Sequence, residues 1–208
     1  MKVRDPGNYA IAVVAITLVY QWPVVYLIGT RRWASNMAIL VCLGLCLAYH
    51  LRHSRSRRHW GFSRRSLLPG LRLVGAFTVP AASAFLGAGY LLESLRWRDD
   101  PLPSFAFLLV WALAQQLALH TLVLRTLETR VSAPALAAGL VFALLHLPNP
   151  FLVPLTFLAG WTWCGIYRRH PHLLPLALSH AVGSFTILNS LPRGVTGGMR
   201  VGYSWFLL

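Results

Sequence analysis

Apolar stretches long enough to cross a bilayer recur from one end of this 208-residue chain to the other. About 20 apolar residues in a helix span the roughly 30 Å hydrocarbon core of a membrane. Hydrophobic residues make up 56% of the sequence, and their arrangement in such runs excludes an ordinary soluble domain. The sequence therefore predicts an all-α fold, a polytopic transmembrane helix bundle.

A window of membrane-spanning length gives seven candidate spans. They run approximately over residues 8–29, 33–51, 71–92, 104–125, 133–147, 150–167 and 172–191. The fifth and sixth are short and meet at a Pro-bounded turn, so we expect them to form a hairpin. We expect the first to be an uncleaved span rather than a signal peptide, because no small-residue cleavage site accompanies it. No internal repeat or low-complexity linker divides the chain, which is interpreted as a single domain, residues 1–208.

The chain is strongly basic, with 19 Lys and Arg against five Asp and Glu. These charges lie between the spans and no RNA-binding signature accompanies them, so membrane lipids with anionic headgroups are the expected partners and nucleic acid is not. With the N-terminus inside, 13 of the 19 basic residues fall on the inner side, including seven from Arg52 to Arg72. We therefore expect an integral membrane protein, of a bacterial inner membrane, with a cytoplasmic N-terminus and an odd number of spans.

Polar side chains inside the apolar spans are the candidate functional residues, because burying them in a bilayer costs free energy. Gln116 and His120 are four residues apart and share one helix face, with Gln115 rotated by about 100° from Gln116. His146 ends the fifth span and His180 lies inside the seventh, with Ser184 one turn later. One alternative is that these groups only hydrogen-bond neighbouring helices. The other is that three histidines on three helices bind a metal or transfer a proton in a shared cavity.

We assign no functional site to the other histidines or to the cysteines. His50, His53, His59, His170 and His172 lie at predicted loops and interfaces and are expected to be solvated. The three cysteines, Cys42, Cys46 and Cys164, all fall within apolar runs, which favours helix packing over a disulfide framework.

Three motifs in order resemble the CAAX-protease and bacteriocin-processing family of intramembrane proteases. They are Gln115-Gln116-Leu117-Ala118-Leu119-His120, Phe142-Ala143-Leu144-Leu145-His146 and His180-Ala181-Val182-Gly183-Ser184. The resemblance covers about residues 60–191, including the run of residues 60–65 before the third span. It implies an intramembrane endopeptidase whose substrate is a membrane protein, a prenylated peptide or an isoprenoid.

The first motif departs from the family pattern of two Glu and an Arg, which here become Gln115, Gln116 and His120. An amide can orient a water but cannot take its proton at neutral pH. Both members of the family's i to i+4 ion pair are replaced together, which leaves no unpaired buried ion. Ser184 stands where the third motif usually has Asn or Asp. The five acidic residues all lie at or beyond span ends, so a catalytic base, if one exists, is expected to be His.

Two functions follow from this pattern. In the first, a divergent endopeptidase holds a water or a metal such as zinc with His146 and His180, Gln115 positions it, and His120 supplies the missing base. In the second, the same bundle is a catalytically silent or repurposed member that binds an isoprenoid, another lipid or a partner membrane protein. The lost Glu residues make weak or absent peptidase activity the expected property of this chain.

Overall fold

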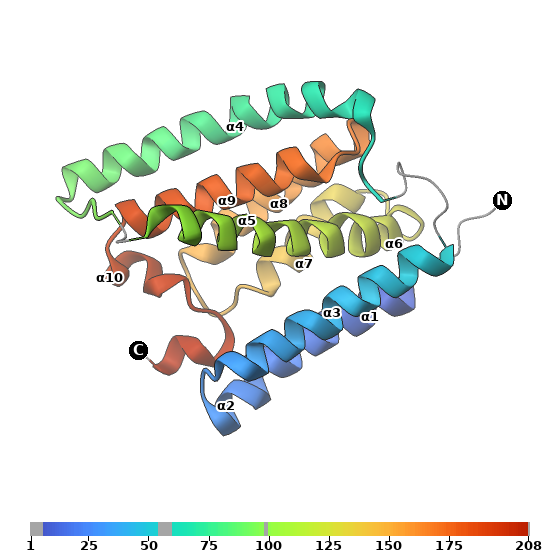
Figure 1. Ribbon diagram of the computed structural model, residues 1–208, viewed down its shortest axis with the longest axis horizontal. Helices are drawn as coiled ribbons and strands as arrows, with labels where there is room; N and C mark the ends of the chain where they lie inside the picture. Colours follow the sequence, from blue (N-terminus) through green and yellow to red (C-terminus); the bar gives the residue numbers. More distant parts are fainter. Residues whose placement is uncertain (1–5, 54–59, 98–99, 208) are drawn as a thin grey trace.

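The computed structural model describes residues 6–53, 60–97 and 100–207 of the protein (Figure 1). Those residues fold into helices without a strand, and an isolated antiparallel bridge joins Phe62 to His172. The predicted all-α polytopic bundle is confirmed. Each of the seven expected spans corresponds to a helical segment, and the bounds are α1 (Gly7–Val19), η1 (Tyr20–Val24), α2 (Val25–Ile28), α3 (Arg32–His53), α4 (Arg64–Leu91), α5 (Pro101–Ala118), η2 (Leu119–Leu124), α6 (Arg125–Glu128), α7 (Pro134–Leu144), α8 (Leu152–Arg169) and α9 (Leu173–Ser190).

Among the described residues, five helical segments are long and apolar enough to cross a membrane. They are Gly7–Ile28, Arg32–His53, Arg64–Leu91, Pro101–Glu128 and Leu173–Ser190. The fifth predicted span is shorter than expected, since α7 has 11 residues and ends at Leu144. At 1.5 Å per residue it is about 16 Å long, roughly half of the hydrocarbon core. Pro148 and Pro150 explain the early end, because proline lacks the backbone donor that a continuing helix needs.

The helices α7 and α8 form the hairpin predicted from the sequence, and glycines bring them close together. A side chain on Gly139 would come within 2.7 Å of the Trp161 backbone nitrogen, and one on Gly160 within 3.1 Å of the Gly139 Cα. Small residues at such a crossing let two helix backbones approach closely. This contact fixes the end of α7 against the body of the bundle.

Figure 1 shows α4, α5 and α9 side by side with the α7–α8 hairpin, while α1 and α3 pair along one flank. After α9 the chain turns back as α10 (Arg193–Thr196), η3 (Gly197–Met199) and η4 (Gly202–Leu207). The last of these segments packs against η1 and α2. The C-terminal part of the chain therefore joins the flanking pair to the rest of the bundle.

Two helices contain π-helical turns. The first, η1, includes Pro23, whose missing backbone donor accounts for the altered hydrogen bonding. The second, η2, has no proline and begins three residues after Gln116 of α5. Such turns occur frequently at functional sites.

Two histidines expected to be solvated are buried, so that expectation is wrong for them. His50 is fully buried, with its Nε2 2.9 Å from the Thr121 hydroxyl and its ring stacked on Trp60. His172 is buried at the start of α9, where its Nδ1 accepts a hydrogen bond from the Leu174 backbone nitrogen. Both find polar partners that compensate for lost hydration, which spacing along the chain does not reveal. His59 lies outside the described residues.

Candidate active site

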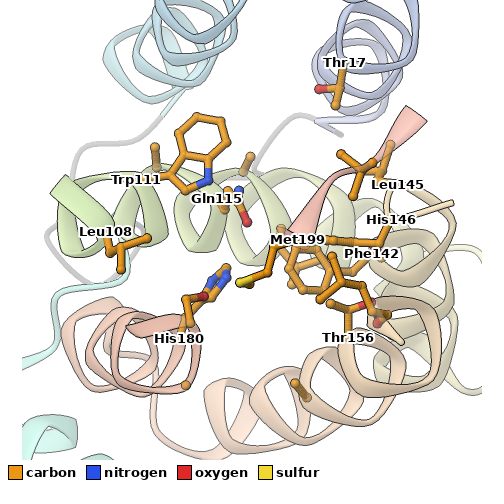
Figure 2. Close-up of a pocket in the computed structure, with 18 of the residues that line it drawn as sticks. Thr17, Leu108, Trp111, Gln115, Phe142, Leu145, His146, Thr156, His180 and Met199 are labelled. Carbon is orange, nitrogen blue, oxygen red and sulfur yellow. The ribbon is translucent and has the colours of Figure 1, made fainter. Parts of the chain in front are cut away.

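A cavity of about 610 Å³ opens inside the bundle, and four of the predicted polar residues line it. Gln115 from α5, His146 after α7, and His180 and Ser184 from α9 all line it (Figure 2). Most of the remaining lining is aliphatic or aromatic, with contributions from α1, α3, α4 and α8. A few polar groups in a largely apolar cavity form the arrangement that usually binds a small molecule or an extended chain.

The two glutamines of α5 differ in what they face. Gln115 lines the cavity, and its buried Oε1 accepts no hydrogen bond from the described residues. Gln116 is fully buried behind it, where its Nε2 donates to Nδ1 of His180 over 3.4 Å. Their difference in direction follows from the rotation of 100° per residue in a helix. Gln115 is thus available to a molecule in the cavity, whereas Gln116 acts on His180.

The ring of His146 is held by the turn at the end of α7. Its Nδ1 donates to the Phe142 carbonyl oxygen at 2.6 Å, so the neutral ring keeps an unprotonated Nε2. The Phe142 ring packs edge-on against both histidines of the cavity, with centroids 4.7 Å from His146 and 5.8 Å from His180. One phenyl ring therefore contacts both imidazoles.

His180 has the opposite tautomer. Because its Nδ1 accepts from Gln116, the neutral ring carries its proton on Nε2. Trp163 of α8 stacks on this ring at 5.0 Å and 29°, and the Trp163 indole donates to Ser179 over 2.9 Å. The Ser179 hydroxyl is in turn 2.6 Å from the Thr78 hydroxyl of α4. A chain of contacts across three helices thus fixes the position of His180.

Residues 89–186 match the family described as "Type II CAAX prenyl endopeptidase Rce1-like". The match contains all three polar motifs and the four cavity-lining residues Gln115, His146, His180 and Ser184. The chain is similar to the CAAX protease family over these residues, which are just under half of its length. It is accordingly a CAAX-protease-like intramembrane protein, with a lipid environment around its apolar helices. No curated protein and no solved structure is significantly similar to the chain.

Within this CAAX-protease-like bundle, His120 lies apart from the cavity lining. It is fully buried in η2, its Nδ1 donates to the Gln116 carbonyl at 2.8 Å, and its ring packs 4.7 Å from that of Tyr167. Glu128 does not belong to the site either. It forms an ion pair with Arg168 at 3.2 Å, and both side chains are partly exposed. The structure brings together Gln115, His146, His180 and Ser184, with Gln116 behind them.

The donor set of the cavity does not fit a zinc centre. Zinc in proteins generally has at least three protein ligands among Cys, His, Asp and Glu. The described residues contain no group of three such side chains, and of the two cavity histidines His180 already accepts from Gln116 at Nδ1. We therefore assign no chemistry to a metal at His146 and His180.

Several residues of the site lie outside the three motifs and were not predicted from the sequence. Trp163, Thr78 and Met199 line the cavity but lie on other elements, at positions that hydropathy alone marks as ordinary. Ser179 of the same network directly precedes His180, the first residue of the third motif. The roles of Trp163, Thr78 and Met199 depend on packing between elements that are distant in sequence.

Proposed function

We propose that this protein is a divergent CAAX-protease-like endopeptidase that hydrolyses a membrane-embedded peptide slowly, with His146 as the general base. The observation that supports it is the hydrogen bond from His146 Nδ1 to the Phe142 carbonyl, which leaves Nε2 with its lone pair in a residue that lines the cavity. A general base must have such a lone pair within reach of the proton that it removes.

In this proposal, a water attacks the peptide carbonyl carbon while His146 Nε2 takes one of its protons. The oxyanion that forms is stabilised by Nε2–H of His180, because the Gln116 amide holds that ring in the donating tautomer. Ser184 lines the cavity one turn later and offers a hydroxyl as a second donor. The C–N bond then breaks as His146 returns the proton to the leaving amine.

Gln115 is assigned the role of positioning the water. Its Oε1 has no partner among the described residues, so it is available to accept a hydrogen bond from a water molecule. It cannot accept the proton itself, and loss of a positioned general base typically costs about 10²–10⁴-fold in rate. His120 is assigned a structural role in place of the base role considered above, because it does not line the cavity.

The test is peptide cleavage in liposomes by the wild type and by the variants His146→Ala, His120→Ala and Gln115→Glu. We expect slow cleavage by the wild type, none by His146→Ala, and a gain toward the about 10²–10⁴-fold range with Gln115→Glu. His120→Ala should lower stability and leave cleavage by the folded fraction in place. Cleavage that survives His146→Ala at the wild-type rate would contradict this assignment.

A silent or repurposed member is the second candidate, and the neutral chemistry of the cavity favours it. Gln115 and Gln116 replace the usual carboxylates, and most of the lining is apolar, which suits an isoprenoid, another lipid or a membrane-protein segment. No cleavage by the wild type, together with cleavage by Gln115→Glu, would support this candidate over the first.

A further inference from the structure

The residues after α9 form a segment that turns back across the cavity, here called the C-terminal strap, residues 192–207. Five of its residues line the cavity, namely Gly198, Met199, Arg200, Val201 and Ser204. Figure 2 shows the Met199 side chain extending between His180 and Phe142. The side chain thus occupies space next to both histidines to which the proposed hydrolysis assigns a role.

The backbone of the strap is unusual around Met199. Met199 has a φ of 57°, in the left-handed region that residues other than glycine rarely adopt. Gly197, Gly198 and Gly202 also have positive φ, at 59°, 62° and 59°. Glycine adopts such values without strain, whereas Met199 needs surrounding contacts to hold it there, and residues of this kind cluster at ligand clamps and switches.

Asn149, in the turn between α7 and α8, supplies the main contact. It is fully buried, and its Nδ2 donates to the carbonyl oxygens of Thr196 at 2.9 Å and Arg200 at 3.0 Å, which flank Met199 on both sides. Its Oδ1 accepts from the backbone nitrogens of Phe151 and Leu152 at the start of α8, both at 3.0 Å. One amide therefore ties the strap to the hairpin that carries His146.

The strap also contacts the turn after α7 and the η1 segment, where Gly202 packs closely against the Gln21 backbone. The Gly202 backbone nitrogen donates to the Leu147 carbonyl at 2.6 Å. Tyr203 packs edge-on against Tyr26 at 5.0 Å, and Phe206 lies 6.5 Å from Trp22, with Tyr26 and Phe206 62% and 59% exposed. No strap residue belongs to the buried apolar clusters of the bundle, so the strap can leave its site while those clusters stay packed.

We propose that the C-terminal strap is an autoinhibitory lid, in which Met199 fills the position of the substrate and Asn149 is the latch. The strap lies outside the matched residues 89–186. A peptide that enters the cavity must displace Met199 first. The identity of the substrate rests on the proposed function, but the opening of the lid is measured independently of cleavage.

The latch is tested by the rate at which a thiol reagent reaches the cavity. The parent carries Ser184→Cys as a reporter, with Cys42→Ala, Cys46→Ala and Cys164→Ala removing the native thiols. Asn149→Asp keeps an oxygen for the α8 backbone nitrogens and removes both donors to the strap. An open state that is about 0.1–10% populated becomes dominant, so we expect labelling to accelerate by about 10- to 1000-fold.

The matched control is Asn189→Asp, the same exchange at a buried asparagine of α9 whose Nδ2 donates to the Phe185 carbonyl. It should leave the labelling rate at the parent value. Met199→Ala, which shortens the occupying side chain and keeps the latch, should also accelerate labelling. Equal labelling rates in the parent, Asn149→Asp and Met199→Ala would overturn the lid.

If Asn149→Asp does not fold, amide hydrogen exchange of the wild type decides the question. If the strap is a lid, the Gly202 amide should exchange faster than the amides in the middle of α9. Equal protection from exchange would show that the strap does not open. Cleavage assays on Asn149→Asp and Met199→Ala in the chain that keeps Ser184 and the native cysteines separate the two proposals, because Ser184 belongs to the proposed site. Faster labelling without any cleavage would contradict the peptidase and support the lid. Cleavage by the wild type, together with unchanged labelling rates in the variants, would support the peptidase and contradict the lid.

Discussion

Single backbone atoms decide the protonation pattern of several histidines in this protein. The Phe142 carbonyl binds the Nδ1 proton of His146, while the Leu174 backbone nitrogen donates to Nδ1 of His172. His172 therefore needs to be neutral to cap the first turn of α9. Burial also lowers the pKa of His172 below its usual range, because the charged imidazolium loses hydration.

This pKa shift gives stability a pH dependence with a definite sign. A lowered pKa in the folded state means that the stabilising contribution is fully present above the unfolded pKa of about 6.5, and that it is lost as the pH falls through the folded pKa. Asparagine at this position keeps a cap acceptor without titrating. We expect His172→Asn to lose less thermal stability than the wild type between about pH 8 and about pH 5. Parallel loss of Tm in detergent for both proteins would show that His172 is not the titrating group.

Hydropathy predicted the helices well and their ends less well. All seven expected spans are helical, since an apolar run in a membrane must satisfy its backbone internally. The length of α7 was overestimated, because apolar residues continue to Leu147 after the helix stops at Leu144. The π turn at η2 also escaped prediction, since its residues have no proline to mark it.

The crossing of α7 and α8 depends on the absence of a side chain at one position. Gly139→Ala would place a Cβ 2.7 Å from the backbone nitrogen of Trp161, which cannot rotate away. We expect a loss of about 1–3 kcal/mol in the free energy of unfolding, the usual range for overpacking. Gly165→Ala on α8 is the control, because a Cβ there meets nothing within 4 Å. Denaturation in detergent should separate the two variants, and equal losses would contradict the close-packing explanation.

The connections between the helices gather at two opposite ends of the molecule. Which end faces the cytoplasm stays a prediction. The start of α1, the α6–α7 connection and the start of α9 lie at one end of the bundle, while α10 lies at the other (Figure 1). The described basic residues Arg125, Arg130, Arg168 and Arg169 all fall toward the first end. The rule that Lys and Arg favour the cytoplasmic side places this end inside.

Cysteine labelling from one side of the membrane checks this orientation. In a background without native cysteines, Ser132→Cys in the α6–α7 connection and Val195→Cys in α10 both present exposed positions. We expect an impermeant thiol reagent added to intact cells to label Val195→Cys alone, with both labelled after the cells are broken. Labelling of Ser132→Cys in intact cells would reverse the assignment.

At this scale Gln115, His146, His180 and Ser184 line one cavity, as polar groups in apolar helices favour one another over lipid, and their role as a functional site stays a prediction. The sequence assigned His120 to the same set, although η2 buries that ring against Tyr167. It did not predict the C-terminal strap, whose main contact joins Asn149 to residues 47 and 51 positions away. Such a contact has neither a period nor a hydropathy signal.

The amides, imidazoles and hydroxyl that meet in the cavity have a consequence for energised membranes. A full charge that moves across a membrane gains or loses about 2.3 kcal/mol per 100 mV. Gln115, Gln116 and Ser184 carry no charge, in contrast to the Glu and Arg pattern that the first motif resembles. The transmembrane voltage therefore does little work on these groups. An uncharged ligand should enter this site equally well in polarised and in depolarised vesicles.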